Sequence, residues 1–227
     1  MDGSTASKGT APRFSSDRVE MVPRVVSADH LDGIFNQLCL LSAAGDLRGN
    51  DEDPMTQIFY APLALEGLFP RIRTVVSQAV GEDVLPAFSF LWLYKRGAGI
   101  HRHIDRDSSE IVASITIDTG CEAGWPIGFE PGTGSEFYVD SNRGDLVIFE
   151  GHSVYHWRNP LDADWHLQAI FNFVRANGPF AKFQFDGRKH LGLEPIGDVI
   201  TNSVTAVQLA LPDSLISEAC GLARKFR

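Results

Sequence analysis

The sequence is poor in cysteine. Its three cysteines, Cys39, Cys121 and Cys220, are far apart, and no two of them have the C-x-x-C spacing of a zinc ribbon. An odd number of scattered cysteines argues against a disulfide framework and favours a reducing compartment. We therefore predict a cytoplasmic protein without structural disulfides or a zinc ribbon.

The chain also lacks long apolar segments and an excess of positive charge. No stretch approaches the ~20 consecutive apolar residues of a membrane-spanning helix, so we expect no membrane partner. Residues 1–20 contain no apolar core of a secretory signal and are rich in Ser, Thr, Gly and Pro, which predicts a disordered tail. The formal net charge of −9 would repel phosphate backbones, so we expect no nucleic-acid partner.

What the chain does have is enough apolar material for one core. Of its 227 residues 44% are hydrophobic, and this length fits one large domain or two small ones. No internal repeat is visible. We predict a single domain over residues 21–227, with its core at about 86–190, and leave a homodimer open.

The first part of the chain has the periodicity of helices. In residues 27–41 apolar side chains follow one helical stripe, and Ser27 is a suitable N-cap. Residues 65–81 repeat this pattern, with a late start expected at Pro70 and a stop at Gly81. A short C-terminal helix is predicted for residues 211–227.

From residue 86 onward the apolar residues alternate with a period of two, which is typical of strands. The expected strands are 87–94, 110–117, 136–139, 145–150, 154–158 and 167–174. Because helices do not alternate with these strands, we do not expect a parallel βαβ fold. We predict a mainly β fold with supporting α, in which the N-terminal helices pack on an antiparallel sheet sandwich or barrel.

One short motif suggests a metal site. The segment YKRGAGIHRHIDRDSSE, residues 94–110, contains His103-x-Asp105 after a glycine-rich turn. In an extended strand, residues i and i+2 point to the same face, so this imidazole and this carboxylate would converge. A single His-x-Asp pair is common by chance, and the alternative is that His101, His103 and Asp105 are solvated turn residues.

A second motif supplies the missing ligand. In GDLVIFEGHSVYHWRNP, residues 144–160, His156 shares a strand face with Val154 and Arg158. Two imidazoles and one carboxylate on a β scaffold form the facial triad of non-haem Fe(II) oxygenases, which leaves coordination positions open. The alternative for His156 by itself is a core histidine bonded to a carbonyl group.

At these residues the chain resembles the 2-oxoglutarate/Fe(II) dioxygenases, and within them a group of small bacterial proteins similar to prolyl-4-hydroxylase. The resemblance covers roughly residues 60–190 and includes WPI (125–127) and QAIFNFVRANGPFAKFQFDGR (168–188). It implies a double-stranded β-helix, or jelly roll, with Fe(II) held by His103, Asp105 and His156. It also implies 2-oxoglutarate as cosubstrate, O2 as oxidant, and succinate and CO2 as co-products.

The residue that anchors the cosubstrate departs from the family pattern. An Arg or Lys often opens the last strand and binds the distal carboxylate, but His166 occupies that position. We favour Arg158, whose planar guanidinium suits a carboxylate, with His166 as a secondary partner that can serve if it is protonated. Gln168 and Asn172 share the parity of His166 and are expected in the same pocket.

Other roles stay open. Tyr94 either donates its hydroxyl to the cosubstrate or is an aromatic residue at the core edge. Arg158 could instead pair with a surface carboxylate, and Arg175 is then the reserve anchor. Trp125 either covers the substrate or closes the barrel.

The resemblance leaves several functions to compare. We expect hydroxylation of an unactivated C–H of a small molecule or amino acid. Alternatives are desaturation or cyclisation at the same site, a peptidyl prolyl hydroxylase, or a non-catalytic jelly-roll binding module. The intact Asp105 argues against a halogenase, which in this family usually has Gly or Ala at that position.

Overall fold

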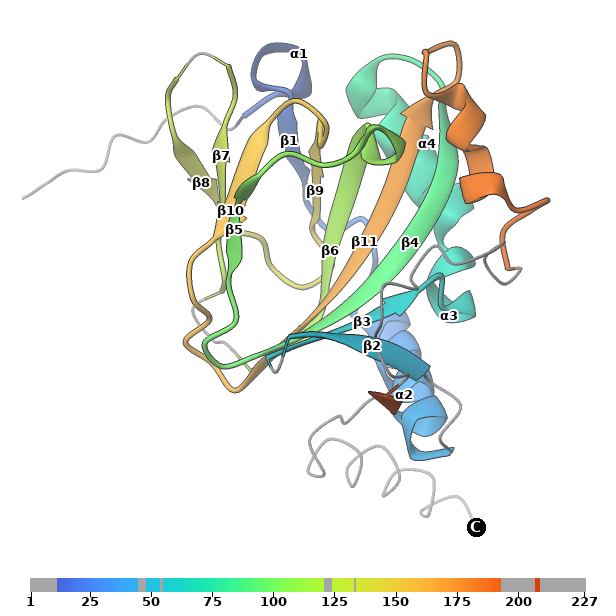
Figure 1. The fold of residues 1–227 in the computed structure, drawn as a ribbon, viewed down its shortest axis with the longest axis vertical. Coiled ribbons are helices and arrows are strands. Elements are labelled where there is room, and N and C mark those ends of the chain that lie inside the picture. Colours follow the sequence, from blue (N-terminus) through green and yellow to red (C-terminus); the bar gives the residue numbers. More distant parts are fainter. Residues whose placement is uncertain are drawn as a thin grey trace, which may run out of the picture.

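The computed structural model describes residues 12–44, 48–53, 55–120, 124–132, 134–192 and 207–208. Two antiparallel sheets face each other, and helices cover the outer side of the larger one (Figure 1). This arrangement confirms the predicted jelly-roll core with N-terminal helices on the sheet. None of the described helices is long and apolar enough to cross a membrane.

The larger sheet has eight strands. Their order is β1 (Val19–Val22), β9 (Leu146–Phe149), β6 (Ile111–Thr119), β11 (Trp165–Arg175), β4 (Val84–Lys95), β3 (Thr56–Tyr60), β2 (Arg48–Asp53) and β12 (Val207–Gln208). The smaller sheet has four strands in the order β5 (Ile100–His103), β10 (Tyr155–Arg158), β7 (Ile127–Glu130) and β8 (Phe137–Val139).

Alternation along the central strands of the larger sheet divides its two faces. On β4, Leu91 and Leu93 belong to the core beneath the helices, whereas Phe90, Trp92 and Tyr94 line a cavity between the sheets. The neighbouring strands β6 and β11 alternate in the same way. Because successive strand residues point to opposite faces, one sheet can bury an apolar core and present a functional surface.

Helices α2 (Ala28–Ala44), α3 (Leu63–Glu66) and α4 (Phe69–Val80) cover the apolar face. The expected helix over 65–81 is in fact two pieces, α3 and α4. Pro70 lies in the first turn of α4, and Gly81 ends that helix in the left-handed conformation with φ of 83°. The expected late start and glycine stop are therefore both confirmed.

Several expectations need correction. The predicted tail over 1–20 is wrong for residues 12–20, because α1 (Phe14–Asp17) and the start of β1 lie there and β1 pairs with β9. The larger sheet also takes in β1 and β3, which precede the expected core at 86–190. The predicted C-terminal helix and residues 1–11 lie outside the described residues, as do Cys121 and Cys220, whereas Cys39 is buried in the core.

Sequence periodicity missed several strands, most of them short. β1, β3, β5 and β7 each have four or five residues, although β8, β9 and β10 are as short and were predicted. Hydrogen bonding to a longer neighbour stabilises such strands, and the sequence does not contain that pairing directly.

Candidate metal centre

Two histidines meet because their strands are neighbours in the smaller sheet. β10 pairs with β5 in antiparallel register, and this register places His156 directly opposite His103. The centroids of the two imidazole rings are 4.3 Å apart. Val154, His156 and Arg158 are buried while Tyr155 between them is exposed, as the predicted alternation requires.

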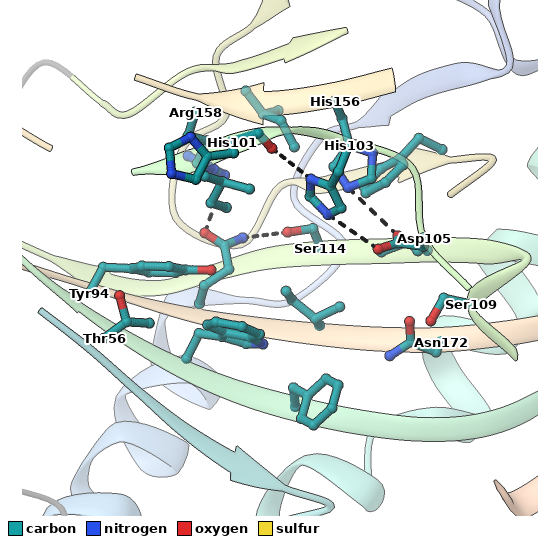
Figure 2. Close-up of a pocket in the computed structure, with 18 of the residues that line it drawn as sticks. Thr56, Tyr94, His101, His103, Asp105, Ser109, Ser114, His156, Arg158 and Asn172 are labelled. Atoms are coloured by element: carbon teal, nitrogen blue, oxygen red, sulfur yellow. Dashed lines mark hydrogen bonds and ion pairs between the residues drawn. The ribbon is translucent and has the colours of Figure 1, made fainter. Parts of the chain in front are cut away.

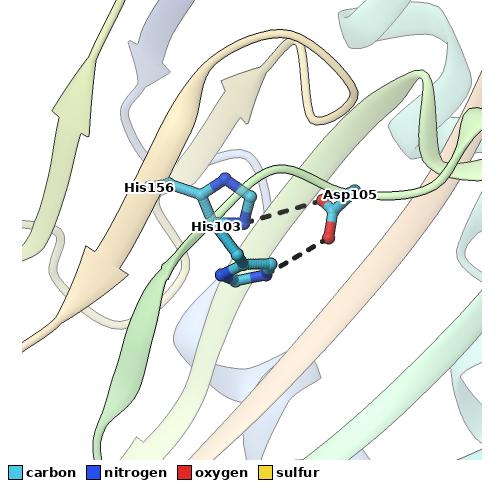
Figure 3. Close-up of side chains that lie close together, drawn as sticks. All are labelled: His103, Asp105 and His156. Carbon is cyan, nitrogen blue, oxygen red and sulfur yellow. Dashed lines mark ion pairs between the residues drawn. The ribbon is translucent and has the colours of Figure 1, made fainter.

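Asp105 completes the group from a loop. β5 ends at His103, so the expected strand geometry of His-x-Asp is wrong beyond that residue. A backbone hydrogen bond from the Asp105 N–H to the carbonyl oxygen of Gly151, at 2.8 Å, positions the turn instead. Figure 3 shows the carboxylate facing both imidazole rings, with Oδ1 3.4 Å from His103 Nε2 and Oδ2 3.6 Å from His156 Nε2.

Hydrogen bonds to the backbone orient both imidazoles. His103 Nδ1 lies 2.7 Å from the carbonyl oxygen of His101, and His156 Nδ1 lies 3.1 Å from that of Val154. A carbonyl oxygen can only accept, so in each ring Nδ1–H donates and Nε2 keeps its lone pair for a metal. One ligand atom from each of His103, Asp105 and His156 lies within 4.8 Å of the others.

The two histidines titrate differently. Burial lowers the pKa of His156, which keeps this imidazole in the neutral form that binds metal. The hydrogen bond to Asp105 raises the pKa of His103. A metal ion at this position therefore competes with a proton for His103.

The histidines and Asp105 line a cavity of about 470 Å³ between the two sheets. Figure 2 shows Arg158 and Tyr94 toward one end of this cavity, and Ser109 and Asn172 near Asp105 at the other. A metal ion held by the three ligands would thus face a partly open cavity large enough for small molecules.

Arg158 is a buried cation at one end of the cavity. It is 5% exposed, and its guanidinium lies 4.6 Å from the centre of the Trp125 ring. It donates hydrogen bonds to the carbonyl oxygen of Trp125 and, at 3.3 Å, to Gln168 Oε1. Burial lowers its pKa to about 10, so the side chain keeps its charge at neutral pH.

His166 lies behind this end of the cavity and is not among its lining residues. Its Nε2 donates to Gln168 Oε1 at 2.5 Å, and its Nδ1 accepts from Thr119 Oγ1 at 3.0 Å. Burial, and next the charge of Arg158, lower its pKa to about 3. Desolvation therefore opposes the protonated form in which His166 could pair with a carboxylate.

The other residues considered for the cosubstrate divide into two groups. Gln168, Asn172 and Tyr94 line the cavity. Arg175 does not, because its guanidinium forms ion pairs of 2.7 Å with each of three carboxylates, those of Glu82, Glu110 and Glu150.

Trp125 is a closing residue of the barrel rather than an exposed cover. It is 6% exposed and packs its ring 4.9 Å from Tyr94 and 5.1 Å from His166. Its indole N–H donates to the carbonyl oxygen of Asn159 at 2.8 Å.

Sequence reasoning missed several cavity-lining residues, among them the polar or hydrogen-bonding Thr56, Trp92, Ser109 and Ser114. Trp92 and Ser114 could have been found from strand parity, because they alternate in step with Tyr94 and Val112 on the cavity face. Thr56 and Ser109 had no such signal, since β3 is short and Ser109 lies in a 3₁₀ turn.

Solved structures with this fold are numerous. A prolyl-4-hydroxylase from Pseudomonas putida is 20% identical with a TM-score of 0.56, over 71% of this chain and 95% of that one. The epimerase SnoN from nogalamycin biosynthesis, in complex with Fe3+, alpha ketoglutarate and nogalamycin RO, is 14% identical with a TM-score of 0.62, over 81% and 90%. A 2OG-Fe(II) oxygenase family oxidoreductase from Burkholderia pseudomallei is 13% identical with a TM-score of 0.59, over 73% and 89%.

These likenesses confirm the predicted resemblance at the level of the fold. No family model matches the chain, and no curated protein matches it.

Removing any of the three ligands should abolish metal binding. We expect His103→Ala, Asp105→Ala and His156→Ala each to weaken Fe(II) or Co(II) binding by more than about 100-fold. Loss of a residue that only hydrogen-bonds to a metal ligand already lowers metal affinity by about 10- to 100-fold. Anaerobic titration with Co(II), followed by its absorption spectrum, measures this. His101→Ala is the matched control, because this neighbouring histidine also lines the cavity but does not belong to the group. Wild-type affinity in one of the three variants would remove that residue from the site.

Gly151 should position the carboxylate ligand. A Cβ atom at Gly151 would lie 2.6 Å from Asp105 Oδ2 and 2.6 Å from the carbonyl oxygen of Ser109. Gly151→Ala must therefore displace the carboxylate, and we expect Co(II) affinity to fall by about 10- to 100-fold. The control is Gly132→Ala, whose Cβ would meet nothing within 4 Å. Unchanged Co(II) affinity in a folded Gly151→Ala protein would contradict this role.

Proposed function

We propose that the protein is an Fe(II)- and 2-oxoglutarate-dependent dioxygenase that hydroxylates a C–H bond of a small molecule. The observation that carries the proposal is the convergence of His103, Asp105 and His156 at a cavity between two sheets, with both Nε2 atoms turned to one point. Three protein ligands on such a scaffold leave coordination positions open for a chelating cosubstrate and O2. The intact carboxylate ligand argues against halogenation.

The donor set fits the proposed metal. Two neutral imidazoles and one carboxylate suit Fe(II) and reduce its charge by half, and the set has no thiolate that would favour zinc or copper. With 2-oxoglutarate and O2 bound, iron supplies the oxidising chemistry, and succinate and CO2 are the co-products. The iron-containing complex of SnoN is consistent with such a role for this fold.

Arg158 would hold the distal carboxylate of 2-oxoglutarate. It is charged, buried and in the lining of the cavity, and its existing hydrogen bonds are to neutral oxygens, those of Trp125 and Gln168. A carboxylate would give this cation the compensation that neutral oxygens supply only in part. Gln168 is fixed in turn by its amide, which donates to Ser114 Oγ at 2.6 Å. Tyr94 lines the same end of the cavity and would contribute to the same pocket.

An anaerobic titration tests the proposal directly. Fe(II) and 2-oxoglutarate added to the protein should together produce the charge-transfer absorbance of the chelated cosubstrate, and His103→Ala should lose it. Exposure to air should then release succinate, faster when a substrate is present. Absence of both the absorbance and succinate in the wild-type protein would refute the function and favour a binding module.

Loss of Arg158 should weaken the binding of 2-oxoglutarate but not that of the metal. A charge-assisted hydrogen bond contributes ~1.5–3 kcal/mol. Arg158→Ala should therefore raise the dissociation constant of 2-oxoglutarate by roughly 10- to 150-fold and leave Co(II) affinity nearly unchanged. Arg102→Ala is the control on the same sheet, since Arg102 pairs with Glu130 outside the cavity. If Arg158→Ala binds 2-oxoglutarate like the wild type, the anchor lies elsewhere.

His166 should act without charge. Because its pKa is lowered to about 3, the imidazole stays neutral between about pH 6 and about pH 8. His166→Ala should therefore lower the affinity for 2-oxoglutarate by no more than about tenfold, because it removes only the hydrogen bond that positions Gln168. The factor should be the same across this pH range. An effect that grows steadily as the pH falls would mean that His166 is protonated in the complex. The charge-transfer titration at several pH values decides this.

A further inference from the structure

The charges in the cavity are few. Among the described residues that line it, apart from three histidines, only Asp105 and Arg158 carry a charge at neutral pH. On the proposed function, Asp105 is taken by the metal and Arg158 by the distal carboxylate of 2-oxoglutarate. No lining side chain then remains to pair with a charged group of the substrate, and burying an unpaired charge is strongly unfavourable.

One residue of the cavity wall nevertheless has a buried hydrogen-bond donor without a partner. Two buried side-chain atoms find no partner within the described part of the chain, Ser89 Oγ and Trp92 Nε1. Ser89 does not line the cavity, but Trp92 does. An indole N–H only donates, and buried donors are nearly always satisfied. The Nε1 atom has almost no accessible surface in this structure, so a molecule bound in the cavity would supply the acceptor only after a small rotation of the indole ring.

The wall around Trp92 is aromatic. The ring of Phe90 lies edge-on to Trp92 at 6.0 Å, and the ring of Tyr94 stacks on Trp92 at 5.6 Å with an interplanar angle of 11°. All three rings line the cavity from β4, opposite the strands that carry the histidines. Aromatic walls favour flat apolar groups, which gain contact area by stacking or edge-to-face packing.

We propose that the part of the substrate that enters this cavity is uncharged and flat, and has an oxygen acceptor that receives the N–H of Trp92. The substrate class is therefore a neutral aromatic or unsaturated ring compound with a carbonyl or ether oxygen, not a free amino acid. A free amino acid would bring an ammonium and a carboxylate into a lining that has no charge left for either. This inference rests on the proposed function, because that function occupies Asp105 and Arg158.

Matched ligands test the class. Coumarin is flat, neutral and has a carbonyl oxygen, coumarin-3-carboxylate adds one negative charge to the same ring, and phenylalanine has an aromatic ring with both charges of an amino acid. Each is titrated anaerobically by calorimetry into the protein loaded with Fe(II) and 2-oxoglutarate. We expect coumarin to bind at least about tenfold more tightly than the other two, since each of those must bury an unpaired charge.

Trp92→Phe tests the donor, because it keeps an aromatic wall and removes only the N–H. It should weaken coumarin by about 3- to 10-fold, the effect of one neutral hydrogen bond, and leave 2-oxoglutarate within twofold of the wild type. Trp157→Phe is the control, since Trp157 does not line the cavity and donates to the Tyr138 hydroxyl at 3.1 Å. Both variants should bind Co(II) normally.

The outcomes separate this inference from the function on which it rests. Equal or tighter binding of either charged ligand, or failure of coumarin to bind the Fe(II)–2-oxoglutarate complex, would overturn the substrate class. If Trp92→Phe weakens the binding of 2-oxoglutarate and not that of coumarin, the Trp92 N–H donates to the cosubstrate and the inference is wrong. If the charge-transfer absorbance never forms, the proposed function itself fails.

Discussion

Antiparallel pairing of β10 with β5 is the constraint on which the candidate metal centre depends. It sets His156 opposite His103 and leaves both imidazoles on the inner face of the smaller sheet. A slip of one residue would turn His156 toward solvent and bring Tyr155, now 41% exposed, to the inner face. The pairing of β10 with β7 on its other side holds the same register, with His156 opposite Phe129. The position of the two histidines is thus a property of the sheet and not of one loop.

Asp105 depends on a second, weaker constraint, the contact between two turns. The turn after β5 and the turn before β10 are joined by the bond from the Asp105 N–H to Gly151 and by a bond of 3.0 Å from the Gly151 N–H to the carbonyl oxygen of Glu110. Arg175 supports both turns, because it pairs with Glu110 in one and with Glu150 in the other. This explains why the absence of a side chain at Gly151 matters for the position of the Asp105 carboxylate, although Gly151 itself would not bind the metal.

At the other end of the cavity the main physical question is the burial of Arg158. Removing a guanidinium from water is costly unless its donors are satisfied, and here neutral oxygens and the Trp125 ring satisfy only part of them. His166 is kept neutral by the same burial and by this neighbouring charge. The family pattern has an Arg or Lys at the position of His166. In this chain that position holds a neutral histidine, and the permanent cation nearby is Arg158. On the proposed function, Arg158 would supply the positive charge from β10 instead of β11.

The sequence by itself indicated the fold class, the two regions of different periodicity and the three candidate metal ligands. Each of these follows from local information: helical stripes before residue 80, alternation on β4, β6 and β11, and two short motifs around His103 and His156. The charge state of His166, the ordered segment at 12–20, and the short strands β1, β3, β5 and β7 were decided only by tertiary structure. A short strand forms because a neighbour offers hydrogen bonds, and a pKa shifts because distant residues exclude water. The turn at Asp105 and the unpaired indole of Trp92 have the same origin, since both depend on atoms that the chain brings together only when the two sheets close over the cavity.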